Sequence, residues 1–335
     1  MGPKEFALRT GKPEKTISAV LGGTSSITPD MALQFEPVTR IPTSFWMNHQ
    51  QSYDEYLARL RRDVAIDDAA TWAKKFPLAD MIKKGWIPPV SAIRDKTTEM
   101  LTFFGFSTHL AWEDYYFKQQ LKVAFRISLK HTKEPYAISA WLRKGELQAA
   151  DLRASIYSEK KFKEALPEIK SLMAKHPVGF FTQLQNICLG AGVKVVHTPC
   201  ISKAPINGAT RWLNETPFIQ LSGRYNRNDS FWFTFFHEAG HILLHGKKDI
   251  FLEEVEYSDI DKQKETEADE FATRWTLTED EEATVLEAAP RTEEVIKSFA
   301  KKFNTHPAII TGRLQIKKAI PYSLGRTFLQ SVIFD

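Results

Sequence analysis

The sequence has very little cysteine and no long apolar run. Two of its 335 residues are cysteine, Cys188 and Cys200, and no Cys-x-x-Cys pair occurs. This excludes a disulfide framework and fits a reducing compartment. No run of about 18 apolar residues is present, and the opening MGPKEFALRT lacks the apolar stretch of a secretory signal. We therefore predict a cytoplasmic protein that makes no use of a membrane.

Glycine and proline are also scarce, and the net charge is small. Glycine and proline account for 16 and 17 residues, too few for a collagen-like or low-complexity chain. The 45 basic and 41 acidic residues leave a net charge of +4. The basic excess lies in residues 61–175, where it fits either phosphate contacts or an ordinary solvated helix face. The length allows two or three domains, so we predict a globular multidomain protein.

Hydrophobic spacing predicts a mainly helical chain with one small β-sheet. Short helices fill residues 1–58, and Thr28 is placed to cap one of them. Residues 59–175 have the pattern of a helical linker domain. Within it we expect a break at 85–89 and a long amphipathic helix over 112–130.

The next region, residues 176–285, has a mixed α+β pattern, and residues 286–335 form a helical tail. A hairpin is expected at Asn214-Glu215, because apolar strand-like runs flank this pair. The expected elements are strands at 193–196, 210–213 and 218–221 and helices at 230–246 and about 260–276.

The stretch HEAGH carries the clearest chemistry in the chain. It places His237 and His241 four residues apart with Glu238 between them, and on a helix such positions lie on one face, about one turn apart. Two imidazoles there bind one Zn²⁺, while Glu238 reaches a water on the metal rather than the metal itself. With nine histidines in the chain, this motif arises by chance in roughly one chain in a hundred of this length.

The residues around the motif support a rigid helix. Asp229 or Ser230 is expected to cap the helix, and Gly246 to end it. Four aromatic residues are expected to bury the rest of the helix, which holds a metal site firmly. They are Phe231, Trp232, Phe235 and Phe236.

A third metal ligand must come from elsewhere, because a catalytic zinc site usually has three protein ligands. In KQKETEADEFATRW, Glu265, Ala268, Asp269 and Ala272 share one helix face. We predict Glu265 as the ligand and Asp269 as the partner that accepts a hydrogen bond from a ligating imidazole. Glu267, elsewhere on the same helix, is the alternative ligand.

These residues predict metal-assisted hydrolysis of a peptide bond, with Glu238 as general base. A group that stabilises the oxyanion is usually needed, and the candidates are His245, Arg224, Tyr225 and Tyr257. The strand expected around 218–221 is a candidate edge on which an extended peptide pairs.

From about Gly192 to Thr278 the sequence resembles the ImmA/IrrE family of zinc metallo-endopeptidases. The strongest part is NDSFWFTFFHEAGHILLHG followed by ETEADEFA. The Glu-x-x-x-Asp spacing of Glu265 and Asp269 also resembles the third-ligand helix of gluzincins such as thermolysin. The resemblance implies a zincin-like domain with one Zn²⁺ per chain. It also implies a protein substrate that is a transcriptional repressor, often of helix-turn-helix type, or an antitoxin.

The N-terminal segment resembles the Cro/cI-type helix-turn-helix, especially the HigA antitoxin branch. The resemblance is carried by Ala7, Gly11, Ile17 and Val20, and it makes residues 13–21 the recognition helix. The side chains implied to face operator DNA are Glu14, Lys15, Thr16 and Ser18. The helix that usually precedes the motif has no counterpart here, and the segment carries no net charge, which leaves a protein-interaction or dimerisation module as the alternative.

The sequence therefore predicts a zinc metallo-endopeptidase joined to a helix-turn-helix domain, acting as a transcriptional regulator. A homodimer is compatible with such a protein. The alternative is a DNA-binding repressor or antitoxin whose zincin domain binds or senses a partner without turnover. The intact Glu238 favours the enzyme, because a binding site has no need of a general base.

Overall fold

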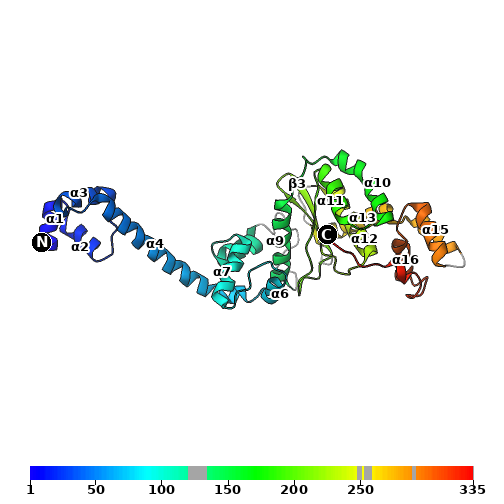
Figure 1. Ribbon diagram of the computed structural model, residues 1–335, viewed down its shortest axis with the longest axis horizontal. Helices are drawn as coiled ribbons and strands as arrows, with labels where there is room; N and C mark the ends of the chain where they lie inside the picture. Colours follow the sequence, from blue (N-terminus) through cyan, green and yellow to red (C-terminus); the bar gives the residue numbers. More distant parts are fainter. Residues whose placement is uncertain (120–133, 247–250, 253–258, 289–291, 335) are drawn as a thin grey trace. The chain divides into compact units, whose positions relative to one another are not determined.

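A computed structural model of the chain describes residues 1–119, 134–246, 251–252, 259–288 and 292–334 (Figure 1). The chain divides into two compact units, residues 1–70 and 71–335, and each is described by itself. The predicted class is confirmed, since the chain is mainly α-helical with one small sheet. None of the described helices is both long enough and apolar enough to cross a bilayer.

The first unit is a small helical bundle. Its helices are α1 (Pro3–Thr10), α2 (Glu14–Leu21), α3 (Pro29–Thr39) and α4 (Thr43–Asp68). Gly11 adopts a φ of 67° between α1 and α2, a conformation that favours glycine. The Thr28 side chain accepts a hydrogen bond from the Met31 amide and caps α3 as predicted. Four buried side chains form the core: Ala7, Ile17, Met31 and Phe35.

The helix α4 changes the expected division of the chain. A domain end was predicted at residue 58, but α4 continues without a break to Asp68, and the first compact unit ends at Ala70. Residues 59–68 have helix-forming composition and no glycine or proline, so nothing in the local chemistry stops the helix at 58.

The second unit begins with short helices. They are α5 (Ala70–Ala73, which starts at the boundary), α6 (Leu78–Lys83), α7 (Ile93–Phe104) and α8 (His109–Glu113). The break predicted at 85–89 is confirmed between α6 and α7. The long helix predicted over 112–130 differs: α8 ends at Glu113, a π-helical turn covers Asp114–Gln119, and the remainder lies outside the described residues. Trp112 and Tyr116 stack there with ring centroids 4.8 Å apart in one buried aromatic cluster.

A four-stranded sheet lies at the centre of the second unit. Its strands are β1 (Lys194–His197), β2 (Gly208–Leu213), β3 (Thr216–Leu221) and β4 (Phe251–Leu252), in the order β1-β3-β2-β4. The hairpin is confirmed, because β2 and β3 pair antiparallel around Asn214, whose φ is 56°. The expectation that 218–221 offers a free edge is wrong. β3 pairs with β1 on one side and with β2 on the other.

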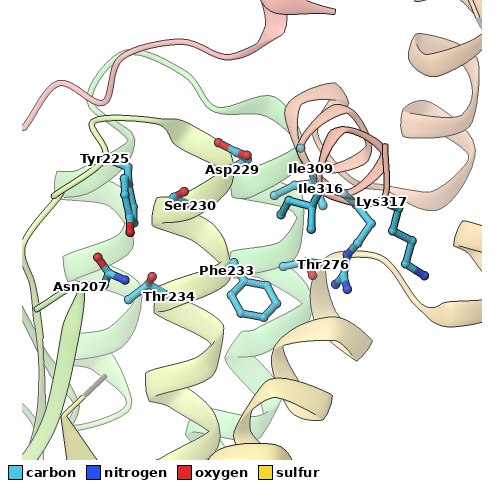
Figure 2. A pocket seen from close by; sticks show the side chains of 12 residues that line it. Asn207, Tyr225, Asp229, Ser230, Phe233, Thr234, Thr276, Ile309, Ile316 and Lys317 are labelled. Atoms are coloured by element: carbon cyan, nitrogen blue, oxygen red, sulfur yellow. The ribbon is translucent and has the colours of Figure 1, made fainter. Parts of the chain in front are cut away.

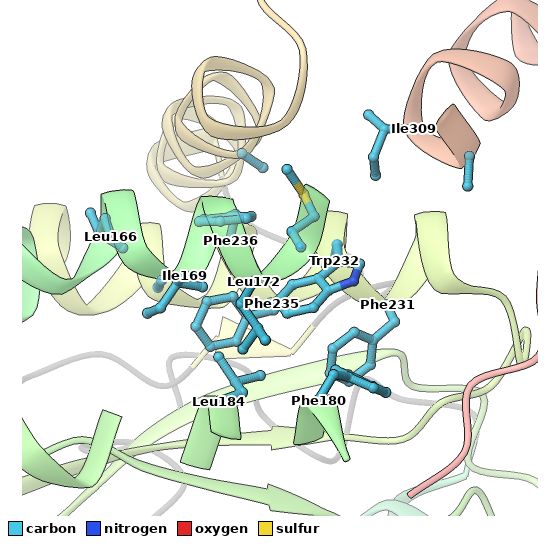
Figure 3. Close-up of a cluster of buried hydrophobic side chains, with 14 of the residues drawn as sticks. Leu166, Ile169, Leu172, Phe180, Leu184, Phe231, Trp232, Phe235, Phe236 and Ile309 are labelled. Atoms are coloured by element: carbon cyan, nitrogen blue, oxygen red, sulfur yellow. The ribbon is translucent and has the colours of Figure 1, made fainter. Parts of the chain in front are cut away.

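The helix α12 (Asn228–His245) packs between this sheet and other helices (Figure 3). Its aromatic side chains enter one large core together with α10 (Glu159–Lys175) and α11 (Phe180–Gly190). The predicted burial of the four aromatic residues is confirmed. Gly246 ends the helix, with a φ of 72°.

The helix α12 starts two residues before its predicted start at residue 230. The helix begins at Asn228 with Arg227 at the cap position, and no side chain caps it there. Asp229 lies inside the first turn and pairs with the Arg227 guanidinium at 2.6 Å. A carboxylate in the first turn still interacts favourably with the helix dipole. The main-chain N–H of Asn228 donates to the Gln330 carbonyl, so the C-terminal segment completes this helix end.

The expected boundary at 175/176 does not separate compact units. Helix α9 (Pro135–Asp151) is held to the sheet by the buried Arg211, which contacts Glu146 of α9 at 2.8 Å. The Gln220 side chain of β3 donates to the Trp141 carbonyl of the same helix. These hydrogen bonds satisfy buried polar groups that would otherwise be costly, so α9 belongs to the body that carries the sheet.

The predicted C-terminal tail is also part of this body. It contains α15 (Glu293–Phe303), α16 (Pro307–Ile316) and a short 3-10 turn at Arg326–Phe328, and the preceding α14 spans Glu279–Glu287. Ile309, Leu314 and Val332 lie in the same hydrophobic core as α12. Near the end of the chain, Phe334 stacks on His197 with centroids 3.4 Å apart.

Candidate metal centre

The centre is built between α12 and α13 (Asp259–Thr276), which pack closely side by side. Small residues allow this approach. Ala268 and Ala272 are fully buried on the face of α13 that was predicted to contact α12. A side chain at Gly240 of α12 would come within 3.2 Å of Phe271. Polar atoms from the two helices therefore reach one another across a short gap.

Three predicted side chains converge in this gap. His237 Nε2 lies 3.2 Å from Glu265 Oε2, and His241 Nε2 lies 3.6 Å from Glu265 Oε1. The two Nε2 atoms are 3.0 Å apart. One ligand atom from each residue falls within 4.8 Å of the others. Both imidazoles are buried, whereas the Glu265 side chain is 19% exposed.

The other ring nitrogens point away from the gap and have partners of their own. His237 Nδ1 lies 2.9 Å from Asp269 Oδ1, so the network assigns Nδ1–H as the donor. His241 Nδ1 lies 3.0 Å from His245 Nδ1, and His245 Nε2 lies 3.0 Å from Glu267 Oε2. When the Nδ1 atoms of His237 and His241 carry the hydrogen and donate it to these partners, the Nε2 atoms of both residues direct their lone pairs into the gap.

This arrangement fits a bound zinc ion. Nitrogen and oxygen ligands about 2.0–2.2 Å from a tetrahedral zinc are roughly 3.3 Å from one another, close to the separations of 3.0, 3.2 and 3.6 Å seen here. Glu265 Oε1 is buried and has no hydrogen-bond donor among the described residues. Two lone pairs and a carboxylate that converge in this way repel one another unless a proton or a metal cation lies among them.

Burial and the neighbouring charged groups shift the pKa values of the two imidazoles in opposite directions. Burial lowers the pKa of His237, but the hydrogen bonds to Asp269 and Glu265 and the charge of Glu238 raise it well above its usual value. Burial and the neighbouring His237 and His245 hold the pKa of His241 well below its usual value. The carboxylates around His237 therefore attract one positive charge to the pair, which is what a metal ion supplies.

Glu238 is fully buried beside this cluster, against strand β2. Its Oε2 lies 2.6 Å from the Thr210 hydroxyl, which is also 2.9 Å from the Glu238 carbonyl. Gly208 leaves room for the carboxylate, because a Cβ there would lie 2.4 Å from Glu238 Oε1. Sequence analysis missed both residues of β2. Thr210 and Gly208 come close to Glu238 only because the sheet packs on α12, and no local sequence pattern encodes that packing.

The remaining predicted site residues are placed in different surroundings. His245 is behind His241 and contacts its outer nitrogen, so it does not face the ligand gap. Glu267 contacts His245 rather than the gap. Arg224 donates to the Pro205 carbonyl, and Tyr225 is half exposed on the loop after β3. Tyr257 lies outside the described residues.

The predicted DNA-facing residues belong to the first unit. Glu14, Lys15 and Ser18 are exposed on α2, and Thr16 is half-buried. Ile17, between them, is buried in the core of that unit. Three of the four side chains that were predicted to face DNA are therefore exposed to solvent.

Two imidazoles and a carboxylate around a gap of metal size, with a second carboxylate beside them, are the arrangement of metallopeptidases. Residues 188–315 match the family model of the IrrE N-terminal-like domain, peptidase family M78. The matched segment starts in α11, contains the whole cluster and ends in α16, beyond the predicted domain end at 285. This part of the chain is therefore similar to peptidase domains of the ImmA/IrrE type. Searches of curated proteins and of solved structures gave no match.

Proposed function

We propose that the protein is a zinc-dependent metallo-endopeptidase, with His237, His241 and Glu265 as metal ligands and Glu238 as general base. One observation carries the proposal: a fully buried carboxylate stands beside a gap where three ligand atoms converge. Burying a carboxylate away from solvent costs free energy, and a site that only binds a metal ion does not need such a carboxylate beside its ligands.

Each residue has a distinct part in this proposal. When bound, zinc polarises the peptide carbonyl and lowers the pKa of a water towards 7. Glu238 takes the proton of the attacking water and returns it to the leaving amine. Thr210 holds the Glu238 carboxylate in place, since its hydroxyl is 2.6 Å from Oε2. Asp269 and His245 fix the orientation of the two imidazoles through their outer nitrogens.

The substrate we propose is a protein partner, a helix-turn-helix repressor or an antitoxin, whose cleavage changes transcription. The ImmA/IrrE type of the peptidase domain supports this substrate class. The alternative, a repressor or antitoxin that senses its partner without turnover, is less favoured because of the buried Glu238.

We further propose that the first unit binds operator DNA through α2. The observation in favour is the exposure of Glu14, Lys15 and Ser18 on a helix whose opposite side is buried through Ile17. A recognition helix needs such a free face to enter the major groove.

The test of the enzymatic proposal is Glu238→Gln in the full-length, zinc-loaded protein. The substrate is the purified helix-turn-helix repressor or antitoxin encoded beside the gene, and cleavage is followed by mass spectrometry. Removal of a general base lowers the rate by about 10²–10⁴-fold, while zinc stays near one per chain because Glu238 is not a ligand. Glu270→Gln, an exposed glutamate on α13, is the matched control and keeps full activity. A Glu238→Gln protein that cuts as fast as wild type would overturn the mechanism.

A further inference from the structure

A cavity of about 280 Å³ opens beside the amino-terminal half of α12 (Figure 2). One wall is α12 itself, and α16 and the end of α13 form the opposite side. The loop after β3 contributes Tyr225. Asn207, Ser230, Phe233, Thr234, Ile309 and Ile316 also line the cavity.

The cavity begins one helical turn from the proposed general base. Phe233 and Thr234 precede His237 and Glu238 by four residues, so they lie on the same faces of α12. At 1.5 Å per residue this separation is about 6 Å along the helix. Strand β2 also connects the wall of the cavity to the proposed general base. Gly208 follows Asn207 in the chain, and a Cβ at Gly208 would touch both Thr234 and Glu238.

This distance matches the spacing of a bound peptide. An extended chain rises about 3.3 Å per residue, so 6 Å corresponds to one or two residues. A polypeptide with its scissile bond at Glu238 would therefore place a neighbouring side chain at the mouth of the cavity.

The lining defines what such a side chain must be. Phe233, Ile309 and Ile316 supply apolar surface, and Ile316 is 79% exposed at the rim. The charged residues of the lining already have partners. Asp229 pairs with Arg227, and both Arg313 and Lys317 pair with the buried Glu282. The cavity is somewhat smaller than the roughly 300–1,000 Å³ of sites for drug-sized ligands, a size that suits one bulky side chain.

We propose that this cavity is a specificity pocket, which selects substrate polypeptides with a bulky apolar residue one or two positions from the cleaved bond. The inference rests on the proposed peptidase function and deepens it by naming the substrate class. The substrate side chain packs against Phe233 and Ile316, and its main chain passes Thr234 on the way to Glu238.

Three variants test the pocket. Ser230→Leu adds volume inside it, since Ser230 is half-buried in the wall. Ile316→Asn removes apolar surface from the rim at a position too exposed to affect folding. Ile156→Asn is the matched control, because Ile156 is 94% exposed and is not among the residues that line the cavity.

The experiment has a binding arm and a turnover arm, both with randomised 14-residue synthetic peptides. In the binding arm, zinc-loaded Glu238→Gln protein retains peptides, which are then identified by mass spectrometry. In the turnover arm, zinc-loaded wild-type protein cuts the same mixture and the cut bonds are mapped. Leu, Ile, Met or Phe should be enriched over Ala by tenfold or more, since a methylene in a hydrophobic pocket is worth about 10–200-fold.

The variants then decide the pocket's role. In both arms, Ser230→Leu should abolish the enrichment, Ile316→Asn should reduce it, and Ile156→Asn should leave it unchanged. Cleavage without apolar preference, or a preference that both pocket variants leave intact, would overturn the pocket while leaving the peptidase proposal standing. Selective retention without any cleavage by wild type would instead overturn the peptidase proposal and support the pocket.

Discussion

The helix pairs α12–α13 and α1–α2 contain the two sets of residues to which the sequence assigned function, and they differ in how those residues are held. In α12–α13 the side chains face inward, and buried polar atoms from two helices meet within hydrogen-bond distance. In α1–α2 the inward side is apolar, and the polar residues of α2 are mostly exposed.

This difference has an energetic consequence. Polar groups in a buried network interact in a low dielectric, and the loss of one member leaves the others without partners. Exposed side chains are screened by water and salt, and each makes a small, nearly independent contribution. Single substitutions should therefore have large effects in α12–α13 and small effects in α2.

The largest effect is expected from His237→Ala. Removal of one of two buried imidazoles leaves a site with two protein ligands, so zinc should fall from about one per chain to near zero. Inductively coupled plasma mass spectrometry of the dialysed full-length protein measures the zinc content per chain. His49→Ala, an exposed histidine of the first unit, should keep its zinc. Full zinc retention in His237→Ala would remove that residue from the ligand set.

Asp269→Asn tests the outer partner of the same imidazole. The carboxylate accepts the His237 Nδ1–H at 2.9 Å although its side chain is 60% exposed. Loss of such a partner lowers metal affinity by about 10–100-fold, which competition with a zinc chelator detects. Glu270→Gln, the adjacent exposed carboxylate, is the control. Equal affinities in Asp269→Asn and wild type would show that His237 is held by packing alone.

Thr210→Val removes a hydroxyl that the sequence did not single out and keeps the side-chain shape. Hydrogen bonds to charged groups contribute about 1.5–3 kcal/mol, so kcat should fall by roughly tenfold or more with KM and zinc content unchanged. Thr210→Ser restores the hydroxyl and should restore most of kcat. If Thr210→Val keeps the kcat of wild type, the hydrogen bond from this hydroxyl does not contribute to the reaction.

The smallest effect is expected from Lys15→Ala on the exposed face of α2. Loss of one phosphate contact should weaken binding to the gene's upstream DNA severalfold. It should also reduce the slope of the logarithm of the binding constant against the logarithm of the salt concentration by about one. Fluorescence anisotropy at several salt concentrations measures both, with Lys4→Ala of α1 as control. Unchanged affinity and slope would count against α2 as the DNA-binding helix.

Much of the site could be predicted because its signals are local. The i, i+4 spacing of His237 and His241 and the small face of α13 are properties of single helices, and both lie where they were expected. The hairpin at Asn214 and the end of α12 at Gly246 likewise depend on nearby residues.

The errors concern contacts between distant segments. Strand β3 was expected at an edge but lies inside the sheet, since β1 pairs with it in parallel and each residue of β1 is 24 positions from its partner in β3. Thr210 and Gly208 reach Glu238 only through the packing of the sheet on α12. The buried Arg211 that joins α9 to the sheet has no local signature either. Pairing partners of this kind are set by the whole fold, which local periodicity does not specify.

The most direct test of the central claim is zinc-edge X-ray absorption on the purified full-length protein. If α12 and α13 hold the metal as proposed, protein that contains about one zinc per chain by elemental analysis will give a spectrum with two imidazole nitrogens at about 2.0–2.1 Å and oxygen in the remaining positions. A sulfur neighbour, a single imidazole or a chain that binds no zinc would contradict it.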